Sequence, residues 1–112
     1  MAGEAALKLE ARAYMKSRPD IWYYATMQNG YGKRGVPDDL ICYKGLFLAI
    51  EYKAPKQHPK VLQSMQLEEI KIAGGAATVA WSMDDIRDLF ERGIGTMPDL
   101  DVPGAYVKVK YY

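Results

Sequence analysis

Two apolar runs separated by only two residues place the strongest constraint on the fold of this chain. Residues 39–43 read DLICY and residues 46–52 read LFLAIEY, and both runs are rich in β-branched, aromatic and large apolar side chains. Lys44-Gly45 lies between them, and a two-residue loop containing glycine is typical of a tight β-hairpin, because glycine readily takes a positive φ. The sequence therefore predicts an antiparallel hairpin in which Tyr43 faces Leu46.

Side chains alternate between the two faces of a strand, so the same register assigns each hairpin residue to a face. The residues of one face are apolar or small: Leu40, Cys42, Phe47 and Ala49. The residues of the other face are aliphatic: Ile41, Leu46, Leu48 and Ile50. A sheet that is apolar on both faces belongs in an α/β domain with helices on either side.

The flanking segments predict an alternation of helices and strands around this hairpin. Helices are expected at residues 2–18, at residues 60–73 and after an N-cap at Ser82. Strands are expected at residues 21–28, 76–81 and 105–112, and residues 93–104 are expected to form a loop. The whole sequence, residues 1–112, is expected to form a single domain.

The composition excludes a membrane span and gives no global argument for a nucleic-acid partner. No apolar run approaches the ~20 residues that a transmembrane helix needs, and the formal net charge is only +1. The N-terminus reads MAGEAALKLE, which lacks the basic start and apolar core of a signal peptide. Cys42 is the single cysteine, so no intrachain disulfide is possible, and a cytoplasmic location is expected.

Three charged residues meet at one end of the predicted hairpin. Counting back through the turn places Asp38 opposite Glu51, with Cβ atoms about 4.5–5.5 Å apart, and Lys53 shares the face of Glu51. Two carboxylates at this distance favour a cation between them, and their hard oxygen atoms suit Mg²⁺ or Mn²⁺. Such a metal lowers the pKa of a bound water beside a phosphate, and Lys53 would orient that water or meet the developing negative charge.

A simpler interpretation of these residues stays open. Lys53 would then form a salt bridge with Glu51 at a strand end, and Pro37-Asp38 would be only a turn. Short patterns of this kind recur by chance, so the three residues alone support both interpretations about equally. Basic residues flank the proposed site and would follow a phosphate backbone there, although clusters this small are more often solvated loops. They are Lys33, Arg34, Lys56 and Lys60.

Three sequence blocks resemble the virus-type replication-repair nuclease (VRR-Nuc) family of the PD-(D/E)XK nuclease superfamily. The blocks are GVPD at residues 35–38, EYKAP at residues 51–55 and PKVLQ at residues 59–63, in the order and at the spacing of that family. The resemblance extends from the first expected helix to about Phe90. It implies the α/β restriction-endonuclease-like fold, which has a mixed central sheet flanked by helices.

The resemblance also implies roles for individual residues. Asp38 matches the metal ligand of the Pro-Asp motif, Glu51 matches the second ligand, and Lys53 matches the catalytic lysine. Gln63 matches a catalytic glutamine that approaches the active site from the following helix. The backbone carbonyl of Tyr52 is a further candidate metal ligand, since Tyr52 lies between two site residues.

Other residues are assigned with alternatives. The family has a glutamate in its first helix that completes the acidic site. Glu10 fits this pattern best and is expected to be a catalytic residue and a further metal ligand, with Glu4 as the competitor. Gln66 lies one helical turn after the expected glutamine and is held in reserve. Asp39 is expected on the opposite face from Asp38, in a structural role.

The function that the resemblance implies is that of a metal-dependent endonuclease, which hydrolyses phosphodiester bonds of DNA with Mg²⁺ or Mn²⁺. Stand-alone viral and phage members of this family are homodimers that cut branched DNA, including Holliday junctions. A homodimer and, for a viral chain, the cytoplasm of a bacterial host are therefore expected. A monomeric flap or structure-specific nuclease and a non-catalytic nucleic-acid-binding module are the alternatives. The candidate DNA contacts are Tyr31, Lys33, Arg34, Lys56 and Lys60.

Several residues that resemble site residues are expected to be structural. Pro98-Asp99 is interpreted as a turn, because no Glu-x-Lys motif follows it. Asp84-Asp85 falls in the first turn of a helix and is expected to stabilise the helix dipole. His58 lies in a loop and is assigned no catalytic role. Cys42 is expected in the hairpin interior.

Overall fold

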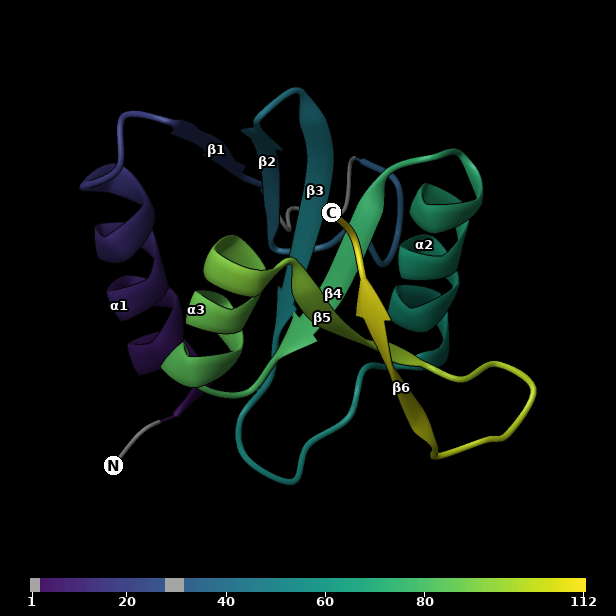
Figure 1. Ribbon diagram of the computed structural model, residues 1–112. Coiled ribbons are helices and arrows are strands. Elements are labelled where there is room, and N and C mark those ends of the chain that lie inside the picture. The colour runs from purple at the N-terminus through teal and green to yellow at the C-terminus, as the bar shows by residue number, and fades with distance from the viewer. Residues whose placement is uncertain (1–2, 28–31) are drawn as a thin grey trace.

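The computed structural model describes residues 3–27 and 32–112. In chain order its helices and strands are α1 (Glu4–Lys16), β1 (Ile21–Ala25), β2 (Asp39–Tyr43), β3 (Leu46–Tyr52), α2 (Val61–Ile72), β4 (Ala76–Ala80), α3 (Met83–Arg92), β5 (Ile94–Pro98) and β6 (Tyr106–Lys110) (Figure 1). Apart from β5, these elements occupy the segments that the sequence predicts, with ends that differ by a few residues.

A mixed four-stranded sheet forms the centre of the molecule, in the order β1-β2-β3-β4. β1, β2 and β3 are antiparallel neighbours, and β3 runs parallel to β4. A parallel pair needs a crossover connection, and α2 supplies it because it lies between β3 and β4 in the chain. The expected α/β class, with a mixed sheet flanked by helices, is confirmed.

The hairpin of β2 and β3 has the predicted register. Tyr43 pairs with Leu46, and continuing the same count places Asp38 beside Glu51. Lys44-Gly45 has φ values of 52° and 77°. Two successive positive φ angles are characteristic of the type I′ turn, whose twist matches that of the flanking strands. The turn therefore fixes the register, and the register fixes which side chains share a face.

Hydrophobic clusters cover both faces of the main sheet. α1 and α3 pack on one face, where Met15 and Leu89 are buried with Ile50 of β3. α2 and β5 cover the other face, where Leu67 is buried with Ala49. Figure 1 shows α1 and α3 on one side of the strands and α2 on the other. This arrangement is the one that the two apolar faces of the hairpin predict.

The strand β5 was expected to be part of a loop, and that expectation is wrong. β5 pairs antiparallel with β6 in a second, two-stranded sheet. Its sequence, IGTMP, does not predict a strand, because glycine and proline are rare in strand interiors. Gly95 is needed here, since a β-carbon would lie 2.8 Å from Oγ1 of Thr78. That oxygen also accepts the backbone N–H of Thr96 at 2.8 Å, which ties β5 to β4.

One part of the main sheet is left open. α2 packs on β3, β4 and β5, and Leu40 of β2 packs against the same cluster, whereas Trp22 of β1 and Cys42 of β2 on this face reach solvent. Trp22 is 63% exposed, and Cys42 is exposed beside it. The expected interior position of Cys42 is therefore wrong, because α2 lies over the β4 side of the sheet rather than the β1 side.

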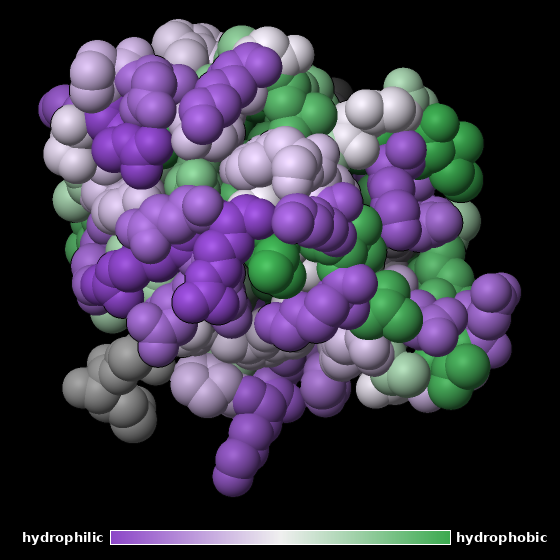
Figure 2. Space-filling view, in the orientation of Figure 1, coloured by the Kyte–Doolittle hydropathy of each residue, from purple (hydrophilic) through white to green (hydrophobic). Residues whose placement is uncertain are grey.

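The surface differs between the two sides of the molecule. Hydrophilic side chains cover most of the face formed by α1 and α3, and apolar side chains are exposed near α2 and the β5–β6 turn (Figure 2). The exposed apolar residues of that second region include Ile72, Leu100 and Val102. In the described part of the chain, none of the helices combines the length and the apolar character that a bilayer crossing requires.

Candidate active site

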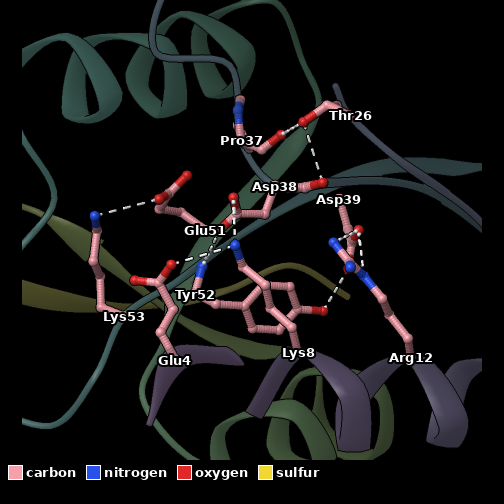
Figure 3. A network of polar contacts seen from close by, with 10 residues as sticks. All are labelled: Glu4, Lys8, Arg12, Thr26, Pro37, Asp38, Asp39, Glu51, Tyr52 and Lys53. Carbon is pink, nitrogen blue, oxygen red and sulfur yellow. Dashed lines mark hydrogen bonds and ion pairs between the residues drawn. The ribbon is translucent and has the colours of Figure 1, made fainter. Parts of the chain in front are cut away.

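Asp38 lies where the chain enters β2, and both its backbone and its side chain are held in place. The Thr26 backbone N–H donates to the Asp38 carbonyl oxygen at 2.9 Å, and the Thr26 hydroxyl donates to the Pro37 carbonyl oxygen at 2.8 Å. Oδ2 of Asp38 accepts the backbone N–H of Tyr52 at 2.9 Å (Figure 3). Asp38 is only 8% exposed, so a carboxylate is held almost buried at the end of the hairpin.

Glu51 lies beside Asp38 in β3 and is 2% exposed. Its Oε2 is 3.6 Å from Nζ of Lys53, whereas its Oε1 is buried and has no hydrogen-bond partner among the described residues. Burial, followed by the negative charge of Asp38, raises the pKa of Glu51 to about 8. The Lys53–Glu51 contact of the simpler interpretation is thus present, but it does not account for the unpartnered oxygen.

α1 brings two further charged groups to this pair. Nζ of Lys8 is 3.3 Å from Oδ1 of Asp38 and 3.3 Å from Oε2 of Glu4. Burial opposes the charge of Lys8, but Asp38 and Glu4 outweigh that effect and raise the pKa of Lys8. We call Glu4, Asp38 and Glu51 the acidic cluster, and Lys8 was not anticipated as its neighbour.

The spacing along α1 explains why Glu4 and Lys8 reach the cluster. Leu7, Ala11 and Met15 form the buried stripe of this helix. Glu4, Lys8 and Arg12 form a parallel row at the same four-residue spacing, and residues so spaced lie on one side of a helix. Figure 3 shows all three side chains of this row rising from α1 toward the sheet. This row was the signal in the sequence that would have identified Lys8.

Two candidates from the sequence lie elsewhere. Glu10 is exposed on α1 and lines a hollow with Trp81 and Arg87, next to the start of α3. Gln66 donates to Oε2 of Glu69 at 3.1 Å on the surface of α2. The structure therefore brings Glu4, rather than Glu10, to Asp38.

Asp39 occupies the face opposite to Asp38 and has structural contacts. The Arg12 guanidinium donates to Oδ1 of Asp39 at 2.9 Å, and the Tyr52 hydroxyl donates to Oδ2 at 2.7 Å. Burial and the Asp39 charge raise the pKa of Tyr52. These contacts join α1, β2 and β3 in the core and support the structural role expected of Asp39.

Gln63 lies in the first turn of α2, where its Oε1 accepts the backbone N–H of Lys60 at 2.8 Å. A side chain in this position caps the helix N-terminus. A β-carbon at Gly35 would lie 2.7 Å from the carbonyl carbon of Leu62, so the loop that leads to Asp38 packs directly on this turn. The backbone of Gln63 thus lies against the loop that precedes Asp38. Its side-chain carboxamide oxygen is used to cap the helix.

The candidate DNA contacts are distributed over two loops. Lys33, Arg34 and Lys60 line one hollow at the first turn of α2. Lys56 is exposed on the turn that follows β3, with a φ of 67°. Tyr31 lies outside the described residues. Three of the basic candidates are therefore gathered where the Asp38 loop meets α2.

His58 has partners that explain it without catalysis. Its Nδ1 is 2.6 Å from the Tyr106 hydroxyl, and the two rings are stacked. The indole N–H of Trp81 donates to the Gln57 carbonyl oxygen at 2.7 Å. These contacts hold the loop after β3 against β6 and against Trp81, the residue that follows β4.

The residues present fit a divalent metal. Carboxylate oxygens of Asp38 and Glu51 and the carbonyl of Tyr52 are the candidate donors, and the unpartnered Oε1 of Glu51 is a hard oxygen that such a cation would satisfy. In residues 3–27 and 32–112, no group of three or more His, Cys, Asp or Glu side chains is placed to hold a metal. Water would therefore complete the coordination shell, as is common for Mg²⁺.

Comparison with solved structures finds a VRR-Nuc domain as a structural neighbour. The match has a TM-score of 0.66 and covers 79% of this chain and 94% of the other, at 20% sequence identity. No protein-family model matches the sequence, and no curated protein matches it. The chain therefore has the fold of a VRR-Nuc domain, and the restriction-endonuclease-like architecture that the three sequence blocks implied is confirmed.

Proposed function

We propose that this chain, which has the fold of a VRR-Nuc domain, is a metal-dependent endonuclease that hydrolyses phosphodiester bonds of DNA. The supporting observation is the buried pair of Asp38 and Glu51, in which Oε1 of Glu51 has no partner within the described residues. Burying such a pair costs folding free energy unless a cation compensates for it. The protein keeps this buried pair of carboxylates despite its cost in folding free energy. A function that needs a bound metal cation explains why.

Each site residue has a role in the proposed reaction. Asp38, Glu51 and the Tyr52 carbonyl would hold Mg²⁺ or Mn²⁺, which when bound lowers the pKa of a water and stabilises negative charge on a phosphate. Lys53 would donate a hydrogen bond to the attacking water or to the phosphate oxygen on which charge develops. The water oxygen bonds to phosphorus while the ester bond to the leaving oxygen breaks, and the leaving oxygen takes up a proton.

Glu4 and Gln63 would assist from the two helices. Glu4 would supply the third carboxylate of the acidic cluster in place of Glu10, as a negative charge near the metal rather than as a ligand; its shared contact with Lys8 and Asp38 supports this assignment. Gln63 would position the water or a neighbouring group from the first turn of α2, where its bond to Lys60 fixes its side chain.

The proposed substrate is branched DNA, cut by a homodimer. The resemblance of residues 35–63 to stand-alone viral VRR-Nuc domains supports both points, because a two-fold dimer presents two sites to a symmetric junction. The hollow of Lys33, Arg34 and Lys60 would bind phosphates of the strand beside the site. Lys56 and Tyr31 are proposed as additional contacts.

Cleavage of labelled four-way junctions, flaps and duplexes with Mg²⁺ or Mn²⁺ tests the proposal. The wild type is expected to cut the junction, and Asp38→Ala and Lys53→Ala are expected to abolish cutting. Asp99→Ala is the matched control in the second Pro-Asp pair, where the carboxylate accepts the Asp101 N–H within a turn, and it should cut like the wild type.

The same assay separates the alternatives when it is combined with light scattering. A monomeric mass together with preferred cutting of flaps would replace the junction-cutting dimer by a flap nuclease. DNA binding without cleavage in either metal would leave only a nucleic-acid-binding module. Undiminished cutting by Asp38→Ala would refute the assigned site.

A further inference from the structure

Lys8 brings a second lysine to the acidic cluster, and the proposed chemistry does not use it. Its ammonium nitrogen is 3.3 Å from Oδ1 of Asp38 and 3.3 Å from Oε2 of Glu4. In Figure 3 it lies between these two carboxylates, while Lys53 approaches Glu51 from another side. Lys8 thus supplies a positive charge between Glu4 and Asp38, where the two carboxylates would otherwise attract another cation.

We infer that Lys8 takes the place of a second metal ion, so that the site binds a single divalent ion through Asp38, Glu51 and the Tyr52 carbonyl. This inference rests on the proposed metal-dependent function and specifies how many ions that function uses. It also gives Lys8 a positioning role, because the ammonium holds Glu4 against Asp38.

The carboxylate oxygen atoms of the acidic cluster differ in whether they already have a partner, and this difference favours a single metal ion. Oδ1 of Asp38 is paired with Lys8, and Oδ2 accepts the Tyr52 N–H. An ion between Glu4 and Asp38 would have to displace the ammonium from both carboxylates. Oε1 of Glu51, by contrast, has no partner in the described part of the chain. A first ion can therefore bind there without displacing a cation.

The packing of α1 on the sheet also restricts where the Lys8 side chain can lie. Lys8 follows Leu7 in α1, and Leu7 and Ala11 are both buried against the sheet. The side chain of Lys8 is only 26% exposed. Because its helix is anchored on this face, the ammonium stays near the cluster even when it is pushed off one carboxylate.

The net charge of the acidic cluster and its two lysines also favours one metal ion. When Glu51 is ionised, as a metal ligand must be, three carboxylates face the two ammonium groups of Lys8 and Lys53. One negative charge remains, so one divalent ion makes the site singly positive and suited to a phosphate. A second divalent ion would leave three positive charges together, which like-charge repulsion opposes.

The test is the number of Mn²⁺ ions that the full chain binds. Isothermal titration calorimetry gives the stoichiometry, and the electron paramagnetic resonance signal of free Mn²⁺ counts the ions independently. The wild type is expected to bind one ion per chain, and Lys8→Gln, which removes the charge at similar length, is expected to bind two. Two ions on the wild type, or one ion on both proteins, would overturn the inference.

Two control variants accompany the test. Lys8→Arg keeps the positive charge and should bind one ion. Lys16→Gln removes an exposed charge from the last turn of the same helix and should also bind one. If circular dichroism shows that Lys8→Gln does not fold, Lys8→Met, which also removes the charge at similar length, takes its place and is expected to bind two ions; one ion on Lys8→Met would overturn the inference. A wild type that binds no Mn²⁺ refutes the proposed metal-dependent function itself, which a wrong count does not.

Discussion

The backbone N–H of Tyr52 donates a 2.9 Å hydrogen bond to Oδ2 of Asp38. Because Tyr52 lies between Glu51 and Lys53, this bond fixes the Asp38 carboxylate against the strand that carries both other residues. On the opposite face, the Tyr52 hydroxyl donates to Asp39 at 2.7 Å. The backbone of Tyr52 therefore organises the candidate site, and its side chain organises the core.

Asp38→Asn and Asp39→Asn should separate these two functions of neighbouring residues. An asparagine at position 38 can still accept the Tyr52 N–H, so Asp38→Asn should remain folded while its cleavage rate falls by about 100-fold or more. Asp39→Asn weakens the buried contacts to Arg12 and Tyr52 and should lower the free energy of unfolding by about 1–3 kcal/mol. Urea denaturation and cleavage rates measure the two effects. Equal losses of stability in the two variants would contradict this division.

The raised pKa of Glu51 predicts that the metal-free protein loses stability as the pH rises. The folded protein keeps the Glu51 proton up to about pH 8, whereas an unfolded glutamate loses it near a pH of about 4.3. Between these values the folded state binds more protons, so the free energy of unfolding falls across this window, by at most a few kcal/mol. Urea denaturation in EDTA at several pH values measures the slope.

Glu51→Gln is the control for this pH dependence. Glutamine has nearly the same shape and does not titrate, so the fall in stability between about pH 5 and pH 8 should be reduced in this variant. Divalent metal should reduce it in the wild type as well, because the metal stabilises the ionised carboxylate. A wild type whose stability rises through this window would show that Glu51 is not protonated in the folded, metal-free protein.

Glu4 and Glu10 offer a matched pair of substitutions on one helix. Glu4→Gln removes a negative charge from the acidic cluster and leaves the Lys8 charge less compensated, so it should weaken Mn²⁺ binding and slow cleavage several-fold. Glu10→Gln changes an exposed residue beside Trp81 and should resemble the wild type. Calorimetric titration with Mn²⁺ and cleavage rates provide the measurement. The reverse order of effects would restore the assignment of Glu10.

The hairpin part of the site can be predicted from sequence because it depends on local geometry. Lys44-Gly45 sets the turn type, the turn sets the register, and the register places Asp38 beside Glu51. The glutamate that α1 contributes to the site depends on which side of the helix packs on the sheet. Glu4 and Glu10 lie on different flanks of the buried stripe that contains Leu7, so the sequence pattern alone favoured the wrong flank for proximity to Asp38.

The remaining differences also come from tertiary contacts. β5 contains glycine and proline and forms because β6 and Thr78 supply its hydrogen-bond partners. Cys42 is exposed because α2 packs mainly on β3, β4 and β5, although the hairpin pattern makes its face apolar. Neither the partner of a strand nor the reach of a helix across a sheet can be read from the local sequence.

Gly35→Ala should loosen the loop that delivers Asp38. Gly35 has a φ of 75°, and a β-carbon there would lie 2.7 Å from both the carbonyl carbon and the carbonyl oxygen of Leu62. These are backbone atoms of the first turn of α2, next to the Gln63 cap, so they cannot move aside freely. Strain and steric conflict together should lower the free energy of unfolding by about 2 kcal/mol or more.

Gly32→Ala is the control in the same loop, because a β-carbon at Gly32 meets no atom of the described residues within 4 Å. Its free energy of unfolding should stay within about 0.5 kcal/mol of the wild type. Gly35→Ala should also slow cleavage, since a displaced loop moves Asp38 away from the Tyr52 N–H and from Glu51. Urea denaturation and junction cleavage measure both effects. Equal stability of the two variants would show that the loop does not press against α2.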